Sequence, residues 1–191
     1  MINSVQDWHT LLDRDDILIL DTETTGFKAD SEVLQVSVID TKGVKRFDEY
    51  VLPLKTIPME SFKIHGLNEK KLKEYGARHW VEYHERFTEL TTKSAQCVLV
   101  YNLDFDTRLL RQTCNMQTPQ ATFVPYNGRC VMKEYATHRK VNKEWGSGWK
   151  WHKLADAAKY EGARNQPNVH NSLNDCEIVL DLIRIVAKQI S

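Results

Sequence analysis

Two carboxylates stand close together near the start of the chain, at the end of an apolar segment. The apolar run of residues 17–20 leads directly into Asp21-Thr22-Glu23, and Gly26 follows shortly afterwards. Such a short apolar run predicts a strand that is buried on both faces. Side chains alternate along a strand, so Asp21 and Glu23 point the same way. Two buried carboxylates at that spacing favour a bound divalent cation, and oxygen ligands suit Mg²⁺ or Mn²⁺ better than zinc.

Polar residues that could join this site occur at two later positions, one after a predicted strand and one at the start of a predicted helix. Asp106 follows a short apolar strand predicted over residues 97–102, and functional groups gather at the carboxyl ends of parallel strands. Asp104 is an alternative to Asp106. His170 and Asp175 stand at the predicted start of the last helix, and both can face one cleft if His170 lies in the preceding loop. Singly, each residue also fits an ordinary role, as a solvated strand end, a first-turn helix acid or a surface histidine.

The hydrophobic pattern places the elements that must hold these residues. Strands are predicted from residue 17 and over 33–40, 44–51 and 97–102. Helices are predicted over 3–14, 78–93, 104–110, around 131–139, over 153–159 and over 170–188, with loops over 116–128 and 140–150. The first three strands are closely spaced, which suggests an antiparallel meander. A helix that lies between two strands implies a crossover and a parallel pairing.

Length and composition fit one ordinary globular domain. The chain has 191 residues, of which 41% are hydrophobic and 27% charged, enough for a sizeable core. No apolar run approaches the length of a membrane span and the N-terminus lacks the regions of a signal peptide, so we expect a cytoplasmic protein without membrane contact. The cysteines lack zinc-ligand spacing, and we expect reduced thiols in or near the core. They are Cys97, Cys114, Cys130 and Cys176.

The charge is balanced overall but unevenly distributed. Lys+Arg and Asp+Glu are both 26, yet residues 1–50 hold eleven acids against five bases, and residues 129–153 hold seven bases against two acids. An acidic region beside a basic one suits a metal site that faces a polyanion. Within the basic region, Trp145, Trp149 and Trp151 alternate with bases, which suits stacking on single-stranded nucleic acid. The alternative is that tryptophans cover a small core under a long loop, which we favour for Trp151.

In this order, the polar groups resemble the motifs of the DEDDh 3′–5′ exonucleases, the superfamily of RNase T and the DNA polymerase III epsilon subunit. The motifs are Asp21-Thr22-Glu23-Thr24-Thr25-Gly26, Asn102-x-x-Phe105-Asp106 and His170-x-x-x-x-Asp175. Ile64-His65-Gly66-Leu67 resembles the family's His-Gly-Ile element, and residues 153–157 resemble the helix before its third motif. The resemblance runs from about residue 17 to 187. It implies one exonuclease domain over residues 1–191 with a ribonuclease-H-like α/β fold, in which helices flank a mixed five-stranded sheet of order 3-2-1-4-5.

The resemblance also implies the activity and its cofactors. The family hydrolyses single-stranded DNA or RNA from a free 3′ end to nucleoside 5′-monophosphates, with two Mg²⁺ ions that Mn²⁺ can replace. The implied metal ligands are Asp21, Glu23, Asp106 and Asp175, and the implied general base is His170. Asp21 would bridge the two ions, while Glu23 and Asp175 would hold the ion that binds the attacking water. Gln35 stands where many members carry Glu, and we expect no loss of catalysis from that difference.

The implied substrate contacts surround the terminal nucleotides. The backbone of residues 24–26 would lie near the terminal sugar, while Phe105 and Leu67 would pack under the terminal bases. The full implied set is Thr24, Thr25, Gly26, His65, Leu67, Asn102 and Phe105.

Three other interpretations stay open. One is a nucleic-acid-binding module on a degenerate nuclease fold, although no acid is missing. A second is a phosphatase with an aspartate nucleophile, which would require a second aspartate at the position of Glu23. The third is a proofreading subunit with a polymerase or another replication or repair protein as its partner. A homodimer is open as well.

Overall fold

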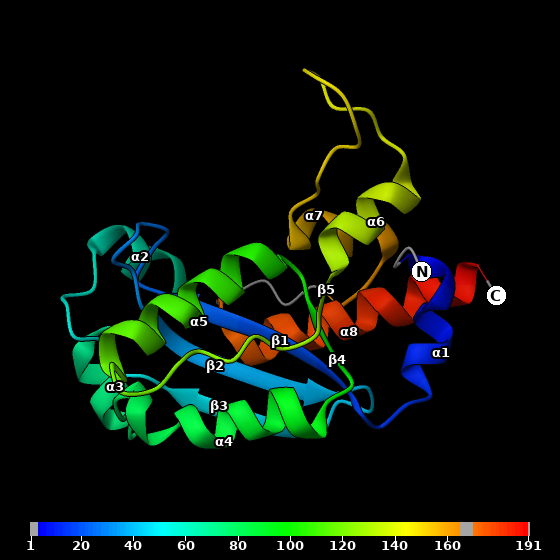
Figure 1. Ribbon diagram of the computed structural model, residues 1–191. Coiled ribbons are helices and arrows are strands. Elements are labelled where there is room, and N and C mark those ends of the chain that lie inside the picture. The colour runs from blue at the N-terminus through cyan, green and yellow to red at the C-terminus, as the bar shows by residue number, and fades with distance from the viewer. Residues whose placement is uncertain (1–3, 165–169, 191) are drawn as a thin grey trace.

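The computed structural model describes residues 4–164 and 170–190, which form helices around one central sheet (Figure 1). The strands are β1 (Ile17–Thr24), β2 (Val33–Asp40), β3 (Lys45–Tyr50), β4 (Cys97–Val100) and β5 (Gly128–Cys130). The helices are α1 (Trp8–Leu12), α2 (Met59–His65), α3 (Glu69–Glu74), α4 (His84–Thr88), α5 (Leu103–Gln117), α6 (Val131–Arg139), α7 (Leu154–Glu161) and α8 (Ser172–Gln189). Short 3₁₀ turns cover Val5–Asp7 and Trp80–Glu82, and a wider π turn covers Glu89–Ser94.

The sheet has the order β3-β2-β1-β4-β5, which confirms the expected ribonuclease-H-like arrangement. β1, β2 and β3 form the predicted antiparallel meander, while β4 and β5 run parallel to β1. In the parallel pair, Leu20 of β1 lies opposite Val100, the last residue of β4. The chain that leaves β4 therefore enters α5 beside the carboxyl half of β1.

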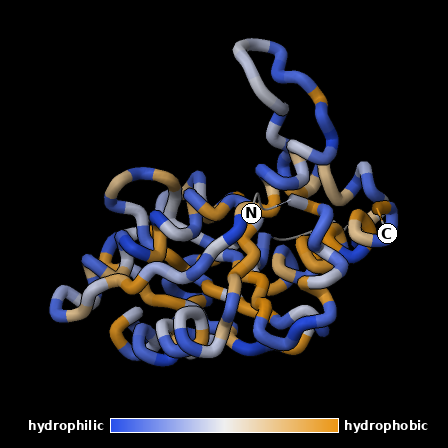
Figure 2. The backbone as a smooth tube through the Cα atoms, turned by 45° about the vertical axis from the view of Figure 1, so that its right-hand side comes forward, coloured by the Kyte–Doolittle hydropathy of each residue, from blue (hydrophilic) through white to orange (hydrophobic). Residues whose placement is uncertain are grey.

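Each face of the sheet has its own hydrophobic core, because side chains alternate along the strands. Ile17 and Ile19 pack on the face covered by α8, together with the fully buried Trp8. Leu18 and Leu20 pack on the opposite face, which α4 and α5 cover. Figure 2 shows the hydrophobic segments concentrated in the body of the molecule. Asp21 and Glu23 continue the alternation of the first set and so point to the α8 side.

Two segments differ from the sequence-based expectation. The single helix predicted over residues 78–93 is divided into the 3₁₀ turn Trp80–Glu82, α4 and the π turn Glu89–Ser94. Near its start, the backbone N–H of Trp80 donates to Gln117 Oε1 at 2.6 Å. The second is β5, which was not predicted and begins at the last residue of a predicted loop. It begins with Gly128, where an added Cβ would come within 2.5 Å of Leu103, so this close approach to α5 favours glycine.

The expectations for the cysteines and for Trp151 had opposite outcomes. The four cysteines are buried and free, as predicted. Trp151 was expected to cover a small core at the start of a helix, and this was wrong: it precedes α7 and 54% of it is exposed. In the described parts of the chain, no helix is long and apolar enough to cross a membrane.

Candidate active site

The carboxyl end of β1 supplies the first two acids. Glu23 is only 7% exposed, and Asp21 is partly exposed. Both line an open cleft of about 310 Å³ at this end of the sheet. The alternation that buries Ile17 and Ile19 under α8 turns both carboxylates toward the start of that helix.

The first turn of α5 supplies the third acid. Asp106 is almost fully buried and lines the same cleft, and its Oδ1 accepts a 2.6 Å hydrogen bond from Thr22 Oγ1. Thr22 lies between the two acids of β1 and points to the opposite face, the side on which α5 packs. The alternative acid, Asp104, points elsewhere: it is exposed and pairs with Lys133 at 2.5 Å. The structure therefore assigns Asp106 to the cleft.

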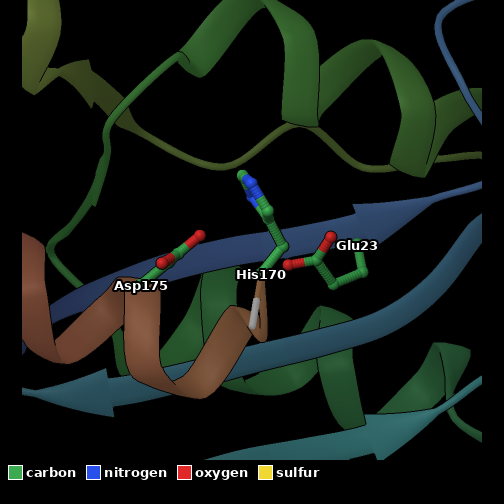
Figure 3. Close-up of side chains that lie close together, drawn as sticks. All are labelled: Glu23, His170 and Asp175. Carbon is green, nitrogen blue, oxygen red and sulfur yellow. The ribbon is translucent and has the colours of Figure 1, made fainter. Parts of the chain in front are cut away.

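The start of α8 brings the last two residues. His170 lies just before the helix cap Asn171, and Asp175 is in the first turn. Ligand atoms of Glu23, His170 and Asp175 all lie within 4.8 Å of one another. Figure 3 shows the His170 side chain standing between the two carboxylates, above β1.

A polar network fixes this helix start to β2. Gln35 Oε1 accepts hydrogen bonds from Asn171 Nδ2 at 3.2 Å and from the Ser172 backbone N–H at 3.4 Å. The Ser172 hydroxyl also lies 2.6 Å from the hydroxyl of Ser37. Because Gln35 pairs with Glu23 across β1 and β2, one strand position supports both sides of the cleft.

The carboxylates of this cleft resist ionisation. Burial raises the pKa of Glu23 to about 8, and the neighbouring carboxylates of Asp175 and Asp106 add to the shift. Burial raises the pKa of Asp106 to about 7, although the Thr22 hydrogen bond opposes the shift. Burial also raises the pKa of Asp175 to about 6, against the opposing effect of His170. The pKa of Asp21 is raised well above its usual value by burial and by the other three acids.

This charge distribution fits a divalent cation. Among the described residues that line the cleft there is no lysine or arginine, so no side chain of that kind balances the four carboxylates. A bound cation would balance them and stabilise their ionised forms. The donor set is oxygen with one imidazole nitrogen, and the carboxylate oxygens suit Mg²⁺ or Mn²⁺.

Most of the implied substrate-binding residues also line the cleft. They are Thr24, Gly26, His65, Asn102 and Phe105. His65 Nδ1 accepts a 3.0 Å hydrogen bond from the Leu67 N–H, and burial lowers the pKa of the His65 imidazole.

Thr25 and Leu67 are not among the residues that line the cleft. The Thr25 hydroxyl accepts a hydrogen bond from the Glu32 N–H at 2.9 Å, which fixes the loop between β1 and β2. Leu67 is buried against Leu34 and Leu72. The left-handed turn at Gly66, with φ of 67°, follows α2 and leads Leu67 into that interior cluster.

Other residues complete the cleft without having been singled out from the sequence. Phe27 is 76% exposed although it lines the cleft, and Ile64, Tyr101 and Leu154 contribute further walls. Phe27 directly follows the first motif, so its place in the sequence could have indicated that it lies at the cleft. Leu154 offered none, because it reaches the cleft only through the packing of α7.

Comparisons with known proteins agree with this geometry. The RNase T exonuclease family model matches residues 18–183. The uncharacterized exonuclease CP81 of Escherichia phage 186 is 34% identical over 178 residues, which cover 91% of this chain and 89% of that protein.

Solved structures show the same fold at low identity. Exonuclease X in complex with 5′ overhanging duplex DNA superimposes with a TM-score of 0.61 and 20% identity, over 88% of this chain and 90% of that chain. E. coli Exonuclease I in complex with a dA16 oligonucleotide gives a TM-score of 0.68 and 16% identity, over 93% of this chain and 42% of that chain. The family match covers most of the chain, including all four acids of the cleft and His170. The chain therefore belongs to the RNase T family of exonucleases, within the DEDDh superfamily.

Proposed function

We propose that this chain is a single-domain, divalent-metal-dependent 3′–5′ exonuclease that degrades single-stranded DNA or RNA to nucleoside 5′-monophosphates. The observation that carries the proposal is the convergence of four carboxylates and one histidine, from three distant segments, on one cleft. Elements that are far apart in sequence bring together acids whose mutual repulsion opposes their ionisation. Such an arrangement is costly unless a cation is part of the site.

The four carboxylates would hold two divalent cations, Mg²⁺ with Mn²⁺ as a substitute. When bound, the cations would polarise the scissile phosphate and make water easier to ionise. The chain itself contributes fixed positions: Thr22 orients Asp106, and Gln35 anchors the helix that carries Asp175. The exonuclease family generally depends on divalent metals, which supports this role.

His170 would accept the proton of the attacking water. It is exposed on the open side of the cleft and lies close to Glu23 and Asp175. As the water oxygen bonds to phosphorus, the bond between phosphorus and O3′ breaks, and the departing oxygen takes a proton from solvent. The products are a nucleoside 5′-monophosphate and a strand that is one nucleotide shorter and ends in a 3′ hydroxyl.

Apolar cleft walls would hold the terminal nucleotides. Phe27, Ile64 and Phe105 line the cleft with aromatic and aliphatic surface on which bases can pack. Exonuclease I and Exonuclease X, which share this fold, are solved with an oligonucleotide and with overhanging duplex DNA. These complexes support a strand with a free end as the substrate of this chain.

The test is digestion of 5′-labelled single-stranded DNA and RNA in Mg²⁺, with the wild type beside Asp21→Ala. We expect a ladder that shortens from the 3′ end and that disappears in the variant and in EDTA. The nucleic acid that is degraded faster, DNA or RNA, is the preferred substrate. Immediate release of the 5′-labelled terminal nucleotide would overturn the polarity. Intact oligonucleotides that the wild type still binds would overturn the activity.

A further inference from the structure

A long segment between α6 and α7 projects from the body of the molecule (Figures 1 and 2). We call residues 140–153 the arm. Its two sides pair, since Asn142 and Trp149 form an antiparallel bridge and the Lys150 N–H donates to Val141 O at 2.7 Å. The arm turns back through Gly146 and Gly148, whose φ angles of 82° and 93° favour glycine. It is therefore a defined ribbon with its own hydrogen bonds.

The arm exposes all of its aromatic side chains. Trp145 is 89% exposed, Trp151 54% and Trp149 36%, whereas Trp8 and Trp80, the other tryptophans of the chain, are fully buried in the two main cores. Scattered apolar residues are common on protein surfaces, but three exposed tryptophans on one projecting segment are not. These three rings therefore contribute little to the hydrophobic cores of the fold.

The arm is also positively charged, in a chain whose net charge is zero. It holds four lysines and one acid, and in the described structure none of these lysines forms an ion pair, whereas Lys133 nearby pairs with Asp104. Lys143 Nζ lies 5.3 Å from the ring centre of Trp151, and Lys133 Nζ lies 5.8 Å from it. Free positive charge and stacking surface thus occur together. The lysines are Lys140, Lys143, Lys150 and Lys153, and the acid is Glu144.

The base of the arm is attached to the rim of the cleft. The Tyr101 hydroxyl donates a 2.8 Å hydrogen bond to the backbone carbonyl of His152, and Tyr101 itself lines the cleft. Leu154, the first residue after the arm, lines the cleft as well. The arm therefore begins at the side of the cleft that Tyr101 and Leu154 line.

We propose that the arm binds the single-stranded part of the substrate on the 5′ side of the nucleotides held in the cleft. The tryptophans would stack on unpaired bases and the lysines would contact phosphates, a combination that binds single strands with little sequence preference. A duplex hides the faces of its bases, so the exposed rings favour an unpaired strand. This inference rests on the proposed function, because it assumes a nucleic acid in the cleft.

The proposal predicts a dependence of affinity on strand length. Binding is measured by fluorescence anisotropy in EDTA, with labelled single strands of about 4 and about 16 nucleotides, since only the longer probe can reach both sites. In the double variant Trp145→Ala/Trp149→Ala, the affinity for the longer probe should fall about tenfold or more, and that for the shorter probe should fall far less. Trp149→Phe keeps an aromatic ring and should bind the longer probe nearly as tightly as the wild type.

Two further measurements report on the arm directly. Because Trp8 and Trp80 are buried, quenching of tryptophan fluorescence by the longer probe reports mainly on the arm. In Lys143→Ala/Lys150→Ala, the slope of log affinity against log salt should become shallower by about one to two. The matched control is Lys70→Ala, an exposed lysine of α3 that lies outside both the arm and the cleft lining, and it should leave the slope unchanged.

Unchanged affinity of the double tryptophan variant for the longer probe would overturn the proposal. Equal losses for a duplex and a single strand would overturn it in favour of duplex binding. A wild-type dimer that becomes a monomer in the variant would overturn it in favour of a contact between two copies. Cleavage of the shorter probe by the wild type in Mg²⁺ tests the proposed function separately, so failure of the arm and failure of the enzyme can be distinguished.

Discussion

Thr22 donates a 2.6 Å hydrogen bond from its hydroxyl to Oδ1 of Asp106, and this bond joins the end of β1 to the first turn of α5. Both side chains are buried, so the bond is shielded from water. The bond stabilises the ionised carboxylate and so lowers the pKa of Asp106, while burial raises it. Burial is the larger effect, and the resulting pKa is about 7. A residue that points away from Asp21 and Glu23 thus tunes the third acid of their cleft.

Replacing Thr22 with valine should move the pH dependence of cleavage upward. The variant keeps the shape of the side chain but loses the donor, so the pKa of Asp106 rises further. At neutral pH we expect about tenfold lower kcat/KM, with partial recovery at higher pH or higher Mg²⁺. Thr22→Ser keeps the hydroxyl and should retain most of the activity. Superimposable pH profiles of the wild type and Thr22→Val would contradict this role.

Two aspartates of the same helix turn should differ sharply in their effect on activity. Asp106 lines the cleft, whereas Asp104 is exposed and pairs with Lys133. We expect Asp106→Asn to lower kcat by about a hundredfold or more. The variant should also need a higher Mg²⁺ concentration for half-maximal activity, because a ligand of the cation is lost. Asp104→Asn should stay within about twofold of the wild type, because exposed ion pairs contribute little. Steady-state rates over a Mg²⁺ titration decide between them, and equal losses would refute the assignment of Asp106.

Removal of His170 should reduce the chemical step and leave cation binding largely in place. Loss of a general base lowers rates by about 10²–10⁴-fold. We expect His170→Ala to fall in this range at neutral pH and to regain rate as hydroxide becomes available. The control is His9→Ala, since His9 is exposed on α1 and does not line the cleft. Single-turnover rates across pH provide the measurement, and a variant within a few-fold of wild type would exclude this role.

The metal-free protein should become less stable as pH rises. Folding raises the pKa of Glu23 to about 8 and that of Asp175 to about 6, so the folded state binds more protons than the unfolded chain between about pH 4.5 and 8. Stability is then greatest at the acidic end of this window and is lost as pH rises through the folded pKa values. In EDTA we expect Tm to drop by about 5 °C or more between about pH 5 and 8.

Adding Mg²⁺ should reverse this loss, most strongly at the alkaline end, because the cation binds the ionised folded state. The matched variant Asp21→Asn/Glu23→Gln removes two of the crowded charges and should flatten the pH profile. Thermal unfolding of both proteins with and without Mg²⁺ provides the measurement. A metal-free wild type whose Tm rises steadily over the same range would show that the acids are not crowded.

The parts of the site that sequence patterns predicted are those with local signals. The apolar run before Asp21 and the short strand before Asp106 mark strand ends, and the order of the motifs matches the family. The resemblance to the family implied the correct sheet order, and the motifs identified the four acids and His170 that line the cleft. Helix α8 was equally clear, because its apolar positions repeat with helical spacing over most of its length.

The parts that were missed depend on contacts between distant residues. Strand β5 has only three residues, and its position follows from the approach of Gly128 to Leu103. The helix predicted over residues 78–93 is interrupted after a turn at which Trp80 contacts the distant Gln117. Leu67 was expected to contact the substrate because it belongs to the motif Ile64-His65-Gly66-Leu67. The turn at Gly66 instead directs its side chain into the interior. None of these contacts leaves a periodic signal in the sequence.

The position of α8 has a consequence for the timing of activity during synthesis. This helix covers Ile17 and Ile19 in one core and also brings Asp175 beside Glu23. It is translated after every strand of the sheet, so a growing chain displays the acids of β1 long before their partners exist. One docking event therefore both closes the core and completes the cleft, so an unfinished copy on the ribosome lacks the two residues of the cleft that precede and begin α8.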